Sequence, residues 1–233
     1  MAREILAEPA QVCGDCHGPA DCYLYAIVER LPRRWRPPAI GVGPAPVVAR
    51  SVRGLMLITS TVDTIPRPTP KSQAQHDDVV AAALGAETVL PLPFGTIMPA
   101  FEVDGWLATH LGLIHVYLAR LRRHVEMTIR LVSLSPGEDA RASLRATAER
   151  LVERAGTPDW RYRDEGPGGL SSSLAFLVPR DGIGDFLARV APVAARAGRV
   201  AVVPTGPWPP ASFSPRLPVP SSVDAPARLA RAG

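Results

Sequence analysis

HVEMTIRLVSLSPGEDA, residues 124–140, contains a strand followed by the start of a helix. From 125 to 131 apolar residues strictly alternate with polar ones, a pattern that is typical of a half-buried strand. Ser135 is then placed as an N-cap and Pro136 at the first helical position. Glu138 is placed to close a capping box with the serine. We therefore expect the helix to begin at Pro136.

The segment after this helix indicates a hairpin. Gly156 and Pro158 end the helical spacing of apolar residues. Two strand-like runs follow at 160–163 and 170–178, and the turn-forming sequence GPGG at 166–169 separates them. Because a tight turn joins the two runs, we expect them to pair with each other.

A second helix and a last strand complete the pattern. Asp181 is placed to cap this helix, in which Pro192 is expected to cause a kink or an early end. Residues 199–203 form the last strand. The order strand, helix, strand, strand, helix, strand is the ferredoxin-like order of elements. The sequence therefore predicts a C-terminal ferredoxin-like domain over residues 124–213.

The first half is similar but less regular. Its predicted helix covers residues 71–84, with Thr69 as the cap and Pro70 at the first position. No helix is expected after its first strand. Strands are expected at residues 22–28, 47–52, 55–62 and 88–97. Residues 22–100 should therefore form an N-terminal α+β domain.

Three further segments complete the predicted organisation. A helix over 103–122 presents one apolar stripe, and we expect the segment 101–123 to bridge the two domains. Residues 1–21 form a cysteine-containing extension. The tail 214–233 is rich in proline, serine and alanine, so disorder is expected there. The predicted fold class is α+β, with two ferredoxin-like α/β sandwich domains joined by a long helix.

The composition narrows the class of partner. A hydrophobic fraction of 46% is ample for buried cores. The formal charge of +4 would suit an anionic partner, but the arginines are interleaved with 22 acidic residues rather than clustered. No apolar run approaches the roughly 20 residues of a membrane helix, and the first residues lack the pattern of a secretory signal. We expect a cytoplasmic protein with neither nucleic acid nor membrane as a partner.

The cysteines suggest a metal or redox site. Cys13, Cys16 and His17 form the CGDCH signature of covalent haem attachment, but this normally requires export. A zinc site of these residues with Cys22 has suitable ligand types, although adjacent Cys16 and His17 are awkward partners for one tetrahedral ion. We favour a flexible extension with reduced thiols. No cofactor is therefore predicted, and zinc is the alternative.

Catalytic motifs are missing from the sequence. It contains no Walker loop, dinucleotide-binding glycine fingerprint, nucleophile elbow or His-Glu-x-x-His motif. His110, His115 and His124 do not share one helical face. The sequence therefore predicts a protein that is not an enzyme.

Four short motifs occur in a fixed order along the chain. They are YLYAIV at 23–28, VLPLPFGT at 89–96, HVEM at 124–127 and TGPWPPASF at 205–213. Together they resemble the gas vesicle protein GvpL/GvpF family over roughly residues 22–213. The last motif is the most specific, because a Gly-Pro-Trp-Pro-Pro string is improbable by composition alone.

The chain resembles a divergent member of that family. Pro93 stands where the family usually has a basic residue, and Ala211 stands where it usually has a tyrosine. The helix after Ser135 lacks the family's usual Gly-Arg-Ala-Tyr-Leu string. His76 matches a histidine that the family carries on the corresponding helix.

The resemblance implies a function in gas vesicle assembly. It implies a non-catalytic, two-domain accessory protein that binds the major hydrophobic shell protein and helps it nucleate or stay soluble. It also implies other gas vesicle accessory proteins as partners, and association with gas vesicles in the cytoplasm. The alternatives are a metal-binding or redox module centred on the N-terminal cysteines and a ferredoxin-like regulatory scaffold.

The last motif supplies most of the candidate contacts with a partner. Its prolines fix three backbone angles within four residues, so a displayed aromatic ring would dock at a low entropy cost. The favoured alternative is that Trp208 packs across the end of the second sheet and seals its core. The candidate partner-binding residues are Trp208, Pro209, Pro210, Phe213 and Phe94.

The motif at 89–96 favours a structural role. Leu90, Leu92 and Phe94 alternate as in a core strand, and Gly95 marks a bulge or bend. The prolines of the motif lack amide donors. We therefore expect this motif to form an edge strand of the first domain.

Overall fold

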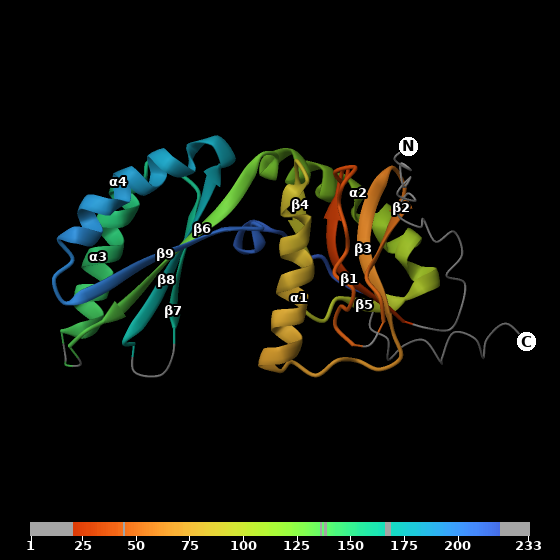
Figure 1. Ribbon diagram of the computed structural model, residues 1–233, viewed down its shortest axis with the longest axis horizontal. Coiled ribbons are helices and arrows are strands. Elements are labelled where there is room, and N and C mark those ends of the chain that lie inside the picture. Colours follow the sequence, from red (N-terminus) through yellow and green to blue (C-terminus); the bar gives the residue numbers. More distant parts are fainter. Residues whose placement is uncertain (1–20, 44, 136, 138, 166–168, 220–233) are drawn as a thin grey trace, which may run out of the picture. The chain divides into compact units, whose positions relative to one another are not determined.

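The structure is a computed structural model, and it describes residues 21–43, 45–135, 137, 139–165 and 169–219. It is a mixed α+β fold with two antiparallel sheets, which confirms the α+β part of the predicted class. The chain divides into two compact units (Figure 1). The first comprises the chain up to Arg122 together with the segment from Ser214 onward, and the second comprises Arg123–Phe213.

The sheet of the first unit is built around β1 (Asp21–Val28). On one side β1 pairs with β3 (Leu55–Val62), and β2 (Val48–Val52) pairs with the outer edge of β3. On the other side β1 pairs with β4 (Val89–Pro91) and β5 (Ile97–Pro99). All of β1 except its first residue is buried, as expected for a central strand with helices on both faces.

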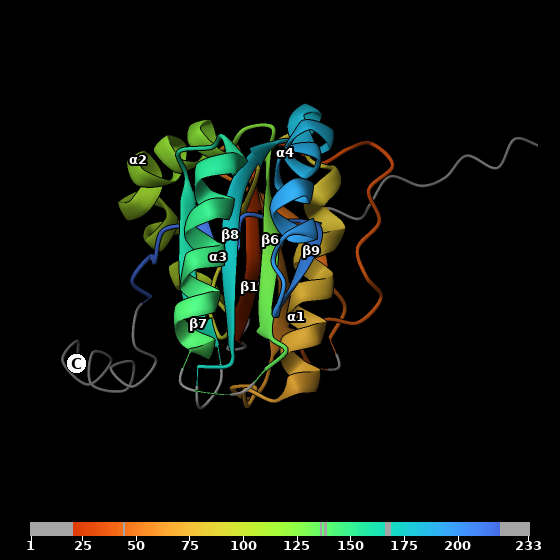
Figure 2. The same ribbon diagram turned by 90° about the vertical axis from the view of Figure 1, so that its left-hand side faces the viewer.

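Two helices cover this sheet, α1 (Pro70–Ala82) and α2 (Val103–Leu121), and Figures 1 and 2 show the sheet between them. α1 begins as predicted, because Thr69 Oγ1 accepts a hydrogen bond from the amide of Ser72 and Pro70 takes the first helical position. Short 3₁₀ turns lie at Ala83–Gly85 and Ala100–Glu102. α2, which we expected to act as a bridge, belongs to the first unit.

The prediction of one continuous strand at 88–97 is wrong. This segment pairs with β1 twice, through β4 and β5, and turns sharply between them. Thr96 donates both its amide and its hydroxyl to the carbonyl of Pro93, at 3.2 and 2.7 Å, and Gly95 has a φ of 82°. Such a turn cannot continue a strand. The edge position is as expected, since among the described strands β4 and β5 each pair only with β1.

The second unit follows the predicted order of elements. Its helices are α3 (Ala140–Ala155) and α4 (Ile183–Ala195), which lie on one face of the sheet (Figure 2). Its strands are β6 (His124–Ser133), β7 (Trp160–Glu165), β8 (Ser171–Pro179) and β9 (Val200–Trp208). The sheet order is β7-β8-β6-β9, and every pair is antiparallel. β7 and β9 are therefore its two edges, and the predicted hairpin is β7 with β8.

The core of the second unit lies between this sheet and the two helices. β6 contributes alternate residues, Met127, Ile129 and Leu131, as its sequence pattern predicts. The rings of Phe176 and Phe186 lie 5.3 Å apart in the same core. Alternation thus identified the buried face of β6 correctly.

The predicted start of α3 is wrong. The helix begins at Ala140, whose amide donates to the carbonyl of Gly137 at 3.1 Å in a preceding turn. Asp139 holds the N-cap position without a side-chain hydrogen bond to the helix. Pro136 and Glu138, which the predicted capping box requires, lie outside the described residues.

The ends of the two helices differ in how well they were predicted. α3 ends at Gly156 as expected, in the left-handed conformation with a φ of 66°. Asp181 does not cap α4, because it lies in a 3₁₀ turn, Arg180–Gly182, that precedes the helix. α4 continues through Pro192 for about one turn. The turn predicted at 166–169 lies mostly outside the described residues.

The expectation of a disordered tail is wrong for its first six residues, 214–219. Leu217 is only 8% exposed, and the indole Nε1 of Trp106 donates to the carbonyl of Pro218 at 2.7 Å. These contacts attach the segment to the first unit. Residues 220–233 lie outside the described residues.

Candidate functional site

Two of the sequence motifs meet in the first unit. The Tyr23 hydroxyl accepts from the amide of Gly95 at 3.0 Å and lies 3.0 Å from Nδ1 of His76. A backbone hydrogen bond from the His76 ring to Leu92 favours the protonated ring, so its acceptor is the carbonyl. This chain of hydrogen bonds begins and ends on the motif at 89–96.

The network around His76 is uncharged at neutral pH. His76 is only 5% exposed, and its burial lowers the pKa of the ring to about 4, against the opposing hydrogen bond to Leu92. Burial likewise raises the pKa of the Tyr23 hydroxyl above its ordinary value. Neutral side chains therefore hold the motif in place.

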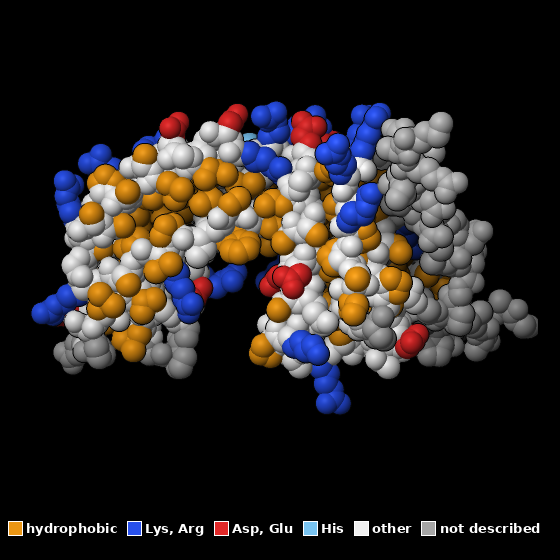
Figure 3. Space-filling view, viewed as in Figure 1, with side chains coloured by type: hydrophobic (Ala, Val, Ile, Leu, Met, Phe, Trp, Pro, Cys, Tyr) orange, Lys and Arg blue, Asp and Glu red, His pale blue; other side chains and the backbone are white. Residues whose placement is uncertain are grey.

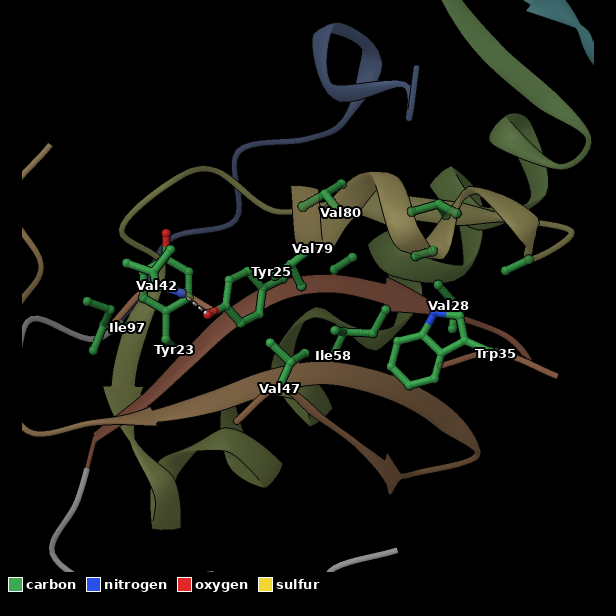
Figure 4. Packing of buried hydrophobic residues seen from close by; sticks show 14 of the residues in the cluster. Tyr23, Tyr25, Val28, Trp35, Val42, Val47, Ile58, Val79, Val80 and Ile97 are labelled. Atoms are coloured by element: carbon green, nitrogen blue, oxygen red, sulfur yellow. Dashed lines mark hydrogen bonds between the residues drawn. The ribbon is translucent and has the colours of Figure 1, made fainter. Parts of the chain in front are cut away.

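Tyr25 makes a similar attachment on the same strand. Its hydroxyl lies 2.7 Å from Oγ of Ser60 and accepts from the amide of Val42 at 2.8 Å (Figure 4). A Cβ atom at Gly41 would overlap this hydroxyl, so the loop can approach only because residue 41 is glycine. The two tyrosines of the motif at 23–28 thus fix two loops to β1.

Phe94 packs against the same cluster of rings. Its ring centroid lies 6.0 Å from that of Tyr23 and 5.8 Å from that of His76. The side chain is partly buried, whereas the neighbouring Pro93 is exposed. The structure therefore places Phe94 in the packing of its own unit, where it remains partly exposed.

The other two motifs meet in the second unit. Glu126 of β6 accepts from the amide of Ser212 through Oε2 and from the Ser212 hydroxyl through Oε1, both at 2.8 Å. Thr128 donates a longer bond of 3.4 Å. Glu126 is 8% exposed, and its burial raises the pKa of the carboxyl, which the bonds from Ser212 oppose. A buried carboxyl group therefore holds the end of the motif at 205–213.

Glycine is required where this motif bends. Gly206 has a φ of 120°, and a Cβ atom there would lie 2.9 Å from the backbone oxygen of Glu126. The register of β9 against β6 shifts at this point, so Trp208 pairs with Glu126 and Thr205 with Thr128. The bend thus sets where the residues after it lie.

The structure separates the candidate binding residues of this motif. Phe213 is 2% exposed, with the guanidinium of Arg161 5.3 Å from its ring centroid, and Pro209 and Pro210 are buried. Trp208 is 47% exposed. The expectation that Trp208 seals the core is therefore wrong, because Phe213 is the buried ring. Of the aromatic residues in this motif, Trp208 alone is available to a partner.

Exposed apolar residues lie along the edge strand β9, which ends at Trp208. Val203 is 46% exposed, and Pro204 and Pro207 are also exposed. Figure 3 shows hydrophobic side chains gathered over α4 and β9. The Trp208 indole donates to Oγ1 of Thr205 at 3.3 Å, which limits its rotation. Together these residues form an apolar edge with one fixed, exposed ring.

The proposed metal ligands are not brought together within the described residues. Cys22 is buried in β1, with 6% exposure, and Cys13, Cys16 and His17 lie outside the described residues. In the described part of the chain, no three His, Cys, Asp or Glu side chains gather closely enough to hold an ion. No described helix combines the length and the apolar character needed to cross a bilayer.

Sequence reasoning missed the contact between Glu126 and Ser212, which attaches the motif at 205–213. Glu126 occupies a polar position of an alternating strand, which indicated a solvent-facing side chain, yet it is buried. Its partner Ser212 is 86 residues away, so no local pattern joins the two. The one available signal was that both residues lie within the quoted motifs.

Comparisons with known proteins agree with this arrangement. A family model described as "Gas vesicle synthesis protein GvpL/GvpF" matches residues 21–157 and 135–215. No curated protein matches the chain. The fold is similar to the crystal structure of the gas vesicle protein GvpF from Anabaena sp. PCC7120, with a TM-score of 0.70 and 16% identity over 84% of this chain and 96% of that one.

A second crystal structure supports the same fold. It is that of the gas vesicle protein GvpF from Microcystis aeruginosa, with a TM-score of 0.65 and 15% identity over 83% of this chain and 98% of that one. The family model covers all four motifs, including both pairs that the structure brings together. The chain therefore belongs to the GvpL/GvpF family of gas vesicle synthesis proteins.

Proposed function

We propose that this protein binds the hydrophobic shell protein of gas vesicles through the apolar edge at Trp208. Membership of the family gives the chain a role in gas vesicle formation. In the proposed role it acts in the cytoplasm, on or near the vesicle, without catalysis. It helps the shell protein to nucleate or to remain soluble, and it works with other gas vesicle accessory proteins.

The exposure of Trp208 carries this proposal. A tryptophan with a fixed backbone and a restrained ring loses little entropy when it docks against an apolar partner. The backbone is fixed because Trp208 pairs with Glu126 and because the hydrogen bonds of Ser212 to Glu126 hold the chain just beyond it. Such a ring has the properties of a binding hot spot.

The prolines of β9 support the same role. Pro204 and Pro207 remove amide donors from an edge strand, and such an edge resists pairing with other strands. A partner would then bind through side chains and not through its backbone. This property suits a protein that handles aggregation-prone chains.

We also propose that the second unit is ferredoxin-like and acts without a cofactor. The strand order β7-β8-β6-β9 with two helices on one face supports the first point. Elemental analysis of the purified protein tests the second. Stoichiometric zinc or iron would favour the alternative site at Cys13, Cys16, His17 and Cys22.

Substitution of Trp208 tests the binding site. Co-expression of the shell protein with the Trp208→Ala variant should reduce co-purification about thirtyfold, because a hot-spot residue contributes about 2 kcal/mol. Phe101→Ala is the matched control, since Phe101 is an aromatic residue of the first unit with 74% exposure. If folded Trp208→Ala retains normal binding and normal vesicle yield, the proposed site is wrong.

A further inference from the structure

The edge strand β7 carries a second surface that the proposed function does not use. Every residue of β7 except the last is exposed, including Trp160 at 39% and Tyr162 at 36%. Among the described strands β7 pairs only with β8. Unlike β9, it contains no proline. This edge is therefore open to backbone pairing.

A groove of about 490 Å³ lies between β7 and α3. β7 lines it with alternate residues, Trp160, Tyr162 and Asp164, whose side chains point to one face of the sheet. α3 lines it with residues spaced along one helical face, and Leu174 of β8 also contributes. The α3 residues are Arg145, Ala148, Glu149, Val152 and Glu153.

The backbone groups of the same β7 residues point to the open edge. The amide of Leu177 donates to the carbonyl of Asp159 at 3.0 Å, which makes these two a hydrogen-bonded pair. Bonded and non-bonded pairs alternate in an antiparallel ladder, so the amides of Trp160, Tyr162 and Asp164 point away from β8. The side chain of Arg161 reaches the carbonyl of Trp160 at 2.8 Å, which agrees with this orientation.

The rim of the groove is acidic. The charged residues that line it are three acids, Glu149, Glu153 and Asp164, and one base, Arg145. Nε of Arg145 lies 3.7 Å from Oε1 of Glu149. The whole chain carries a net positive charge of +4, so the local sign is opposite to the global one. A ligand with basic side chains complements this rim.

We propose that the groove between α3 and β7 binds an extended segment of a partner protein as an added strand. The segment has apolar side chains that alternate along the strand and enter the groove, and basic side chains at its ends that meet the acidic rim. Backbone hydrogen bonds to Tyr162 and Asp164 give affinity, and the groove selects the side chains. This inference does not rest on the shell-protein contact at Trp208.

A second copy of this chain fits the edge poorly. Every antiparallel self-pairing centred on residues 161–163 places an arginine of β7 directly opposite an arginine, either Arg161 or Arg163. Like charges directly opposite each other destabilise a strand pair. The two acidic rims would also approach each other. The charges therefore favour a basic partner over self-association.

Short peptides provide the test. The probes are capped peptides Arg-Thr-X-Thr-X-Thr-Arg, where X is valine, isoleucine, leucine or phenylalanine, and each spans about 23 Å as a strand. Added to the ¹⁵N-labelled full chain, they should shift the amide signals of β7 and α3 with a dissociation constant below about 1 mM. The same peptides with glutamate in place of arginine should bind at least about tenfold more weakly.

Two variants separate strand addition from general charge attraction. Tyr162→Pro removes an outward donor and is tolerated on an edge, whereas Tyr162→Ala removes the ring and keeps the donor. The proline variant should bind the peptides at least about tenfold more weakly than the alanine variant. Successive amides of the peptide lie on opposite edges of the strand. Methylation of the amides on the edge that pairs with β7 should abolish binding, and methylation of the amides on the other edge should not.

Several results would overturn this proposal. Absence of shifts with every peptide at about 1 mM would do so. Equal binding by Tyr162→Pro and Tyr162→Ala, both folded by circular dichroism, would show that no strand is added. Concentration-dependent dimers that Tyr162→Pro abolishes would make a second copy the occupant. The peptide readout is independent of the shell protein, so failure of one proposal leaves the other testable.

Discussion

The two units hold their proline-rich motifs through different kinds of buried polar side chain. In the first unit a neutral network of Tyr23 and His76 holds the motif at 89–96. In the second a buried carboxyl group, Glu126, holds the motif at 205–213 through Ser212. The side chains of Tyr23, His76 and Glu126 are all buried, but only Glu126 is ordinarily charged at neutral pH.

The comparison teaches that burial affects the two attachments with opposite signs. Burial lowers the pKa of His76, so the neutral ring stabilises the fold at neutral pH and this contribution is lost as the pH falls. Burial raises the pKa of Glu126, so the protonated carboxyl is favoured in the fold and its contribution is lost as the pH rises. Acid should therefore destabilise the first unit through His76, whereas a rising pH should destabilise the second unit because it charges the buried Glu126.

The largest effect is expected from a glycine substitution in the motif at 205–213, compared with one in the motif at 89–96. Gly206→Ala combines a φ of 120° with a Cβ atom 2.9 Å from backbone, and should destabilise the second unit by about 4 kcal/mol. Gly95→Ala has a φ of 82° but open space around the Cβ atom, so about 1 kcal/mol is expected. Urea unfolding followed by NMR signals of each unit measures both, and equal losses would contradict the difference.

The next effect is the response of the first unit to acid. His76 has a pKa of about 4 in the fold and an ordinary value of 6.5, so stability is complete above pH 6.5 and falls as the pH decreases towards 4. The full loss is about 3 kcal/mol. Urea unfolding of the first unit at a series of pH values measures it. His76→Gln keeps a donor and an acceptor without titrating, and a loss that persists in this variant would exclude His76 as its source.

The sequence predicted structure set by neighbouring residues well, but it did not predict these contacts between distant residues. Elements set by neighbouring residues were predicted well: the strand β6 by its alternation, the start of α1 by Thr69 and Pro70, and the end of α3 by Gly156. The attachments join residues 53 and 86 positions apart, where no periodic pattern connects them. Only the folded sheets bring such residues together.

The errors have a similar physical origin. The motif at 89–96 has a strand-like alternation, but the hydrogen bonds of Gly95 and Leu92 to Tyr23 and His76 favour a turn. Trp208 and Phe213 are both aromatic, and composition alone does not show which is buried. The bend at Gly206 and the Ser212 contact decide that, because they turn Phe213 inward.

A smaller effect is expected from loss of the Tyr23 hydroxyl. Tyr23→Phe leaves the buried Nδ1 of His76 and the amide of Gly95 without this partner, so the first unit should lose about 2 kcal/mol. Tyr162→Phe is the control, because its hydroxyl donates to Asp164 on an exposed strand and less than about 0.5 kcal/mol is expected. The free energy of unfolding from urea titration measures both. Similar losses in the two variants would contradict a special role for the buried hydroxyl.

The smallest effect is expected from Glu126→Gln. Glutamine keeps the shape of the side chain and does not titrate, so the decline in stability of the second unit as the pH rises above 4.5 should flatten. The measurement is the pH dependence of urea unfolding, compared with that of the wild-type chain. An unchanged slope would show that Glu126 does not set it. Trp208 should keep its exposed environment, which its fluorescence reports.

The bond between Trp106 and Pro218 has a consequence for synthesis of the protein. The two residues are 112 positions apart, and the whole second unit lies between them in the chain. A ribosome that adds roughly 5–20 residues per second would add Pro218 to the chain roughly 6–22 s after Trp106. The second unit, which is continuous in sequence, can therefore fold before the first unit receives its last segment. The unit that begins to emerge first is the one that is completed last.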